Sequence, residues 1–320
     1  MIELKSSLPI LVLGLAISIT SCQPVCKKME PVITCPLPSL KMSCMPSPFL
    51  PLSAEERDQE WAKELLIGDT FARESDFYRA ITCYKRALVL LPPEATARRL
   101  QIDYDITLCY YLGGKYQDAI NHFENSPLSQ TNPDFPAFNN LLIMIYDSYF
   151  QNGQEDKAEC VLKIIEQFSP ETGSDLTLYQ NIKEAEIDQA RVLMSQHRNA
   201  ESMQKNFAFY DQFAKSPRKA RVLNALLPGA GYYYVGQRKT AITSFIINAL
   251  FTAAAYQFFR HGYPAAGAIT ASLEMGWYMG GINGAGIEAS EFNTRLYEGV
   301  SRKILNDNGC FPVLMFETTF

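Results

Sequence analysis

Two long uncharged runs lie next to each other in the last third of the chain. Residues 240–259 contain no charged side chain, and residues 264–286 contain one, Glu274. Twenty helical residues at about 1.5 Å each extend roughly the thickness of a bilayer's hydrocarbon core. We therefore expect a transmembrane helical hairpin within residues 237–290. The alternative is a pair of buried helices in a soluble domain, because alanine, glycine and threonine keep both runs only moderately apolar.

The second run carries glycines at every fourth position, Gly276, Gly280 and Gly284. A glycine inside a soluble helix costs about 1 kcal/mol relative to alanine, whereas in lipid it lets two helix backbones approach closely. This spacing favours the membrane interpretation and leaves open a homo-oligomer formed through the same glycines. Asn248 and Glu274 are two polar groups inside the runs. Such residues either serve a function or form a hydrogen bond that holds the hairpin or a self-association together.

A broken, aromatic turn, "LLPGAGYYYVG" at residues 226–236, precedes the hairpin. It resembles the Pro-Gly-x-Gly-Gln-x-Tyr-x-Gly opening of a class of small bacterial membrane hairpin domains, with Tyr232 in place of the usual glutamine. The resemblance covers residues 217–295 and implies a fold and a location rather than a chemistry, because the function of that class is mostly undefined. The matching positions are Pro228, Gly229, Gly231, Tyr234 and Gly236.

The middle of the chain, residues 54–200, has apolar side chains at helical spacing and an internal repeat. Three alanines recur every 39 residues and an aromatic residue stands nine positions before each; the pairs are Phe71 and Ala80, Tyr110 and Ala119, and Tyr149 and Ala158. We also expect a helix at residues 175–196 that caps the repeats and a shorter one at residues 200–214 that links onward.

The first copy of this repeat resembles the tetratricopeptide repeat (TPR), whose signature positions are occupied by Gly68, Phe71, Ala80, Tyr84, Ala87 and Pro92. The later copies depart from it, with Thr107 and Tyr146 at the glycine position. The resemblance implies stacked helical hairpins with a concave face that binds an extended peptide or a partner helix. Candidate partner-binding residues on that face are Asp103, Asn140 and Asp147. The alternative is that these three side chains belong to solvated helix faces.

The first 22 residues resemble the signal peptide and lipobox of a bacterial lipoprotein. An apolar run at residues 8–19 ends in Ile19-Thr20-Ser21-Cys22. In that family the cysteine thiol is acylated, for example with palmitate, and becomes the new N-terminus, so Cys22 is the predicted lipidation site. A retained membrane anchor and an ordinary secretory signal are the alternatives.

A proline-rich tether at residues 23–53 follows and contains Cys26, Cys35 and Cys44. In an oxidising envelope these thiols could form disulfides with one another, with another chain or with Cys310. The alternative is that they remain unpaired.

The predicted topology contains a conflict. A lipid-anchored chain places the repeats and the basic residues at 215–221 outside the cytoplasm, against the positive-inside bias. Three arrangements would each remove this conflict: a retained anchor, a hairpin that lies in one leaflet, or a lead-in that itself enters the bilayer. The lead-in and its linker occupy residues 201–236.

We expect an all-α chain with no enzymatic activity, no cofactor and no metal site. The three histidines are far apart in the sequence, no phosphate-binding loop or nucleophile motif is present, and the net charge of −5 does not favour nucleic acid. The predicted function is a membrane-anchored TPR adaptor that holds partner proteins at the bacterial cell envelope. The alternative is a subunit of an envelope transport or membrane-protein insertion complex. The tail at residues 291–320 ends in a strand-like segment, "CFPVLMFETTF", to which the sequence assigns no role.

Overall fold

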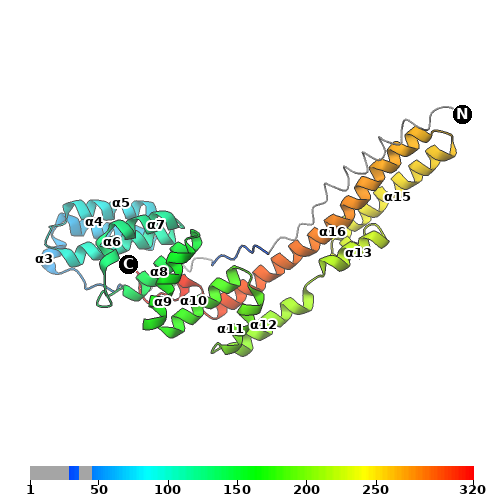
Figure 1. The fold of residues 1–320 in the computed structure, drawn as a ribbon. Coiled ribbons are helices and arrows are strands. Elements are labelled where there is room, and N and C mark those ends of the chain that lie inside the picture. Colours follow the sequence, from blue (N-terminus) through cyan, green and yellow to red (C-terminus); the bar gives the residue numbers. More distant parts are fainter. Residues whose placement is uncertain (1–28, 36–44) are drawn as a thin grey trace. The chain divides into compact units, whose positions relative to one another are not determined.

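The computed structural model describes residues 29–35 and 45–320, and over these residues the chain is helical, with no strand (Figure 1). The predicted all-α fold is therefore confirmed for the described part. The predicted lipidation site Cys22 and the tether cysteines Cys26 and Cys44 lie outside it. The chain divides into two compact units. We call residues 33–203 with 302–320 the repeat unit, and residues 204–301 the hairpin unit.

The repeat unit is a stack of helix pairs that follow one another along the chain (Figure 1). The second helix of each pair packs against the first helix of the next, so the pairs form one continuous layered stack. A short helix, α3 (Ala54–Arg57), precedes the stack. The pairs are α4 (Glu60–Arg73) with α5 (Phe77–Leu90), α6 (Thr96–Leu112) with α7 (Tyr116–Asn125), α8 (Phe138–Gln151) with α9 (Glu155–Phe168), and α10 (Pro170–Lys183) with α11 (Ile187–Gln196), with the 3-10 turn η1 (Pro127–Gln130) between α7 and α8.

Small side chains let the two helices of a pair approach. The repeated alanines Ala80, Ala119 and Ala158 are buried on the second helices. In the first pair, a Cβ added to Gly68 would overlap the ring of Tyr84, so only glycine fits there. In the second pair Thr107 occupies the glycine position, and its buried hydroxyl donates a hydrogen bond to the Asp103 carbonyl.

The same turn closes every pair. One residue in each turn has a left-handed backbone, and these residues are Ser75, Gly114, Gly153 and Ala185. The fourth turn divides the region in which one capping helix was predicted, so that prediction was wrong. Two helices, α10 and α11, form a fourth pair in which Ala190 is completely buried.

The hairpin unit begins within α12 (Ala200–Phe213) and continues through α13 (Pro217–Leu226), α14 (Ala230–Val235) and α15 (Arg238–Arg260). The chain then reverses at residues 261–263 and enters α16 (Pro264–Asp307), which continues well past the predicted end of the hairpin at residue 290. Among the described residues, α15 is the one helix long and apolar enough to cross a membrane. A second membrane span is not shown.

Candidate functional site

The C-terminal segment, residues 308–320, lies across the first helices of all four pairs. It is not a strand: it contains the 3-10 turn η2 (Pro312–Leu314), which packs on α8, and then extended chain. We call the surface under it the tail groove. Four contacts define the groove: Phe311 with the Tyr179 ring of α10 (centroids 6.0 Å apart), Phe316 with the Tyr111 ring of α6 (5.8 Å), Thr318 with Asn140 of α8, and Phe320 with Arg73 of α4.

The polar contacts in the groove recognise mainly the backbone of the segment. The Asn140 amide donates to the carbonyl oxygen of Thr318 at 2.9 Å and to its hydroxyl at 2.8 Å. The Arg73 guanidinium donates to the backbone oxygen of Phe320 at 3.0 Å. On the other side, the Thr319 amide donates to the carbonyl oxygen of Pro46 at 3.0 Å. An extended chain held in this way exposes its side chains to selection by pockets.

All three predicted partner-binding residues are buried, so the idea that they form solvated helix faces was wrong. Asn140 and Asp147 belong to the groove region, and Asn140 contacts an extended segment of the same chain. Asp103 lies instead beside His122 of α7, with 3.2 Å between its carboxylate oxygen and the imidazole Nε2.

Asp147 joins three first helices. Its carboxylate accepts hydrogen bonds from the Tyr111 hydroxyl at 2.7 Å, the Tyr179 hydroxyl at 3.1 Å and the Gln151 amide at 2.9 Å. Burial raises the pKa of Asp147, and these hydrogen bonds oppose the rise. Burial is also the main cause that lowers the pKa of the neighbouring Lys183.

This polar network borders a cavity of about 360 Å³ in the groove. Its lining includes Asp147, Gln151 and Lys183 as well as residues 33–35 and 311–313. The C-terminal segment therefore does not fill the groove at this point.

A second cluster anchors the start of the C-terminal segment. The side chains of Asp175, His197 and Cys310 are buried, and one potential ligand atom from each lies within 4.8 Å of the other two. No motif in the sequence indicates this cluster, because its three residues are far apart along the chain. Cys310 is a free thiol here, and burial raises its pKa to about 12.

The hydrogen bonds of His197 fit an anchor better than a metal centre. Its Nδ1 accepts from the Asn199 amide at 3.1 Å, so in the neutral ring the proton lies on Nε2, 2.8 Å from an Asp175 oxygen. A metal on Nε2 would move that proton to Nδ1, where it would face another N–H. Arg198 supplies a further partner for Asp175 at 3.2 Å.

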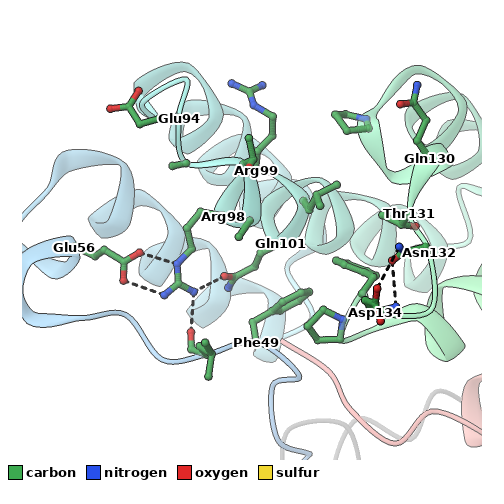
Figure 2. Close-up of a pocket in the computed structure, with 18 residues that line it drawn as sticks. Phe49, Glu56, Glu94, Arg98, Arg99, Gln101, Gln130, Thr131, Asn132 and Asp134 are labelled. Atoms are coloured by element: carbon green, nitrogen blue, oxygen red, sulfur yellow. Dashed lines mark hydrogen bonds and ion pairs between the residues drawn. The ribbon is translucent and has the colours of Figure 1, made fainter.

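A wider cavity of about 830 Å³ opens at the start of α6 and is shown in Figure 2. Its most prominent cation, Arg98, is fully engaged. All five N–H donors of this guanidinium are used, by both carboxylate oxygens of Glu56, by the carbonyls of Leu50 and Pro51, and by the Gln101 side chain, at 2.7–3.1 Å. Arg98 therefore fastens residues 50–56 to the stack and has no donor left for a ligand.

The hairpin entry turn is a close-packed junction. The Asn224 side-chain oxygen accepts from the amides of Gly229 and Gly231 at 2.9 and 3.3 Å. Gly229 is left-handed, with φ +92°, and a Cβ at Gly231 would overlap the carbonyl oxygen of Ala220. Pro228 lies between α13 and α14, and Gly236 ends α14 with φ +94°.

Tyr234 fixes the basic flank of this turn. Its hydroxyl accepts from the Ser216 amide at 3.2 Å. The ammonium groups of Lys215 and Lys219 each lie 5.1 Å from the centre of its ring, a cation–π arrangement.

The predicted hairpin-packing residues separate into two groups. Gly284 packs under the Tyr232 hydroxyl, whereas a Cβ added to Gly276 or Gly280 would meet open space. These two glycines line a cavity of about 610 Å³, so they do not bring helix backbones together within this chain.

Asn248 and Glu274, the two polar residues singled out in the predicted spans, each keep one oxygen without a partner. The Asn248 amide donates to the Ser244 carbonyl at 2.6 Å, but its oxygen has no hydrogen-bond partner. The same is true of one carboxylate oxygen of Glu274.

No family model, curated protein or solved structure matches this chain. The groove, the anchor cluster and the hairpin junction are therefore interpreted from their own chemistry.

Proposed function

We propose that this chain is a membrane-anchored adaptor of the bacterial cell envelope, with TPR-like repeats that bind an extended segment of a partner protein. One observation carries the proposal: the first helices of the pairs already hold an extended segment, residues 315–320, through bonds to its backbone and contacts with its aromatic rings. Stacked helical repeats use such a face for peptide recognition.

The distribution of side chains in the hairpin unit supports the membrane part of the proposal. Large apolar residues are exposed on α15 and α16, whereas Asn224, Ser244 and Asn248 are buried. Water favours the opposite arrangement, and a contiguous exposed apolar surface indicates a lipid or protein environment. The most exposed of these apolar side chains include Ile242, Leu250, Tyr256, Ile269 and Leu273.

We further propose that lipid attached to Cys22 provides a second anchor. One acyl chain gives only marginal binding, and stable attachment needs a second signal, which the hairpin supplies. Incorporation of labelled palmitate by the wild-type chain, and its loss in Cys22→Ala, would test this part.

Site-specific photo-cross-linking in cells tests the adaptor function. A photoreactive residue at Tyr116, which lines the 360 Å³ cavity, should form adducts with a partner protein. The matched control is the same residue at Val89, which is 85% exposed on α5. Equal adducts at both positions, or intramolecular adducts alone at Tyr116, would count against an adaptor.

The second candidate is a subunit of a transport or insertion complex. The unpartnered oxygens of Asn248 and Glu274 favour it, because unpaired polar atoms in apolar helices are costly and therefore mark candidate functional sites. Exchange of Asn248→Ala or Glu274→Gln should then abolish partner adducts from the hairpin, with those from the groove unchanged.

A further inference from the structure

We propose that residues 311–320 are a resident ligand of the tail groove and that the partner segment has the same chemistry. That segment is an extended peptide with aromatic side chains at the spacing of Phe311, Phe316 and Phe320. The inference rests on the proposed function, because it defines the partner class and its regulation at the same site.

The aromatic spacing follows from what each ring meets. The three phenylalanines are almost completely buried, at 2, 3 and 4% exposure. Phe311 and Phe316 pack edge-on or tilted against Tyr179 and Tyr111, at the 4.5–7 Å distances preferred by aromatic pairs. Both tyrosines are held in place through their hydroxyls by Asp147. The groove thus presents two rigid aromatic surfaces from the same network, and a peptide must match their separation.

The polar contacts can be transferred to another chain. Asn140 and Arg73 bind backbone oxygens of residues 318 and 320, and every extended peptide carries such oxygens. The bond between Asn140 and the Thr318 hydroxyl adds a preference for threonine or serine at that position.

The unfilled cavity gives a partner its advantage over the resident segment. The groove beside residues 311–313 retains about 360 Å³, bordered by Lys183 and the Asp147 network. A partner with a larger or hydrogen-bonding side chain in place of Pro312 or Val313 would use this space. It would gain contacts that the resident segment does not make.

The resident segment lowers the apparent affinity for a partner. A tethered ligand acts at an effective concentration in the millimolar range when its linker is short and flexible. The apparent affinity for a free peptide falls in proportion to the fraction of empty grooves. A segment that occupies the groove more than about 90% of the time therefore weakens peptide binding at least about tenfold.

Fluorescence anisotropy with a labelled peptide of residues 311–320 tests the proposal on the detergent-solubilised full-length chain. We expect the variant Phe316→Ser, whose own segment is weakened, to bind the peptide at least about tenfold more tightly than the wild type. Adding Asn140→Ala to that variant should remove the gain. A peptide with serine at all three phenylalanine positions should not bind. As a matched surface control, Phe168→Ser, at an exposed position on α9, should behave as the wild type.

Hydrogen exchange on the wild-type chain provides a second measurement that needs no altered protein. Saturating unlabelled peptide should increase exchange at the amides of residues 315–320.

The proposal is overturned if Phe316→Ser retains its helical circular dichroism but binds the peptide no better than the wild type, or if peptide excess leaves this exchange unchanged. Peptide binding without a partner adduct at Tyr116 in cells would refute the adaptor function alone. Partner adducts at Tyr116 without peptide competition would refute this inference alone.

Discussion

Two carboxylates in the repeat unit, the partly exposed Glu56 and the buried Asp105, have opposite electrostatic environments. Glu56 receives two hydrogen bonds from Arg98, and these are the main cause that lowers its pKa to about 2. Asp105 is fully buried near Asp69, one of its oxygens has no partner, and burial is the main cause that raises its pKa well above the usual value. The first carboxylate therefore stabilises the fold when ionised, and the second opposes it.

Replacing Arg98 should reveal the first effect. Arg98→Lys loses the planar fork that binds Glu56 and two carbonyls, so we expect a loss of about 1–2 kcal/mol at pH 7. The Glu56 contribution is present above its unfolded pKa of about 4.3 and is lost as the pH falls toward 2. In thermal unfolding experiments in detergent, the difference in unfolding temperature between the variant and the wild type should therefore narrow between about pH 5 and about pH 2. Arg99→Lys, at the neighbouring position on α6, is the control. A difference in unfolding temperature that stays constant across this pH range would contradict the role of ionised Glu56.

Asp105→Asn should have the opposite pH profile. Because the folded-state pKa of Asp105 is raised, its unfavourable effect is absent below the unfolded pKa of about 3.9 and grows as the pH rises above it. The asparagine variant should therefore unfold at a higher temperature than the wild type at pH 7 and at a similar temperature near the unfolded pKa. A variant less stable than the wild type at pH 7 would show that the carboxylate makes a favourable bond.

Glycines serve two different purposes in the packing of the helices of the hairpin unit. Gly231 lies where α14 touches the Ala220 carbonyl of α13, whereas Gly276 on α16 faces open space. The two positions look alike in the sequence, because each belongs to a glycine-rich motif. Only the packing of the helices separates them.

A matched alanine pair tests this difference. Gly231→Ala should lower stability by about 1–3 kcal/mol, because the added methyl overlaps a backbone oxygen that has little room to move. Gly276→Ala should leave the monomer unchanged or more stable, because alanine favours helix and meets no neighbour. Limited proteolysis of the α13–α14 region in detergent measures both. Similar cleavage of the two variants would contradict the proposed close contact.

The helix pairs with a constant 39-residue spacing were predictable from the sequence, because buried Ala80, Ala119 and Ala158 repeat one local packing requirement. The fourth pair was missed because Ala190 follows Ala158 at a shorter interval, so its alanine does not fall on the 39-residue repeat. The tail groove could not be found in this way. Its contacts, such as Phe316 with Tyr111, depend on long-range packing that leaves no periodic signal. The last segment looked strand-like in the sequence, and nothing in it indicated the surface on which it packs.

At the scale of the whole molecule, the two units bury different kinds of side chain. The repeat unit has an apolar core that also contains hydrogen-bonded polar residues such as Asn140 and Asp147. The hairpin unit buries small and polar groups at the entry turn and along α15, and it exposes large apolar ones. One chain with both patterns fits two solvents, water around the repeats and lipid around the hairpin.

A charge placed on each of the two surfaces would test this division. Leu250 is 64% exposed near the middle of α15, and Val89 is 85% exposed on α5. In lipid, an arginine at the centre of a span costs about 2.5–3.5 kcal/mol, whereas in water it costs almost nothing. In a Cys22→Ala background, which removes the proposed lipid, Leu250→Arg should shift the chain from the pellet to the supernatant of carbonate-washed membranes, and Val89→Arg should leave it in the pellet. If the Cys22→Ala chain is already in the supernatant before either change, the hairpin is not embedded in the bilayer, and its exposed apolar face must be covered by protein instead.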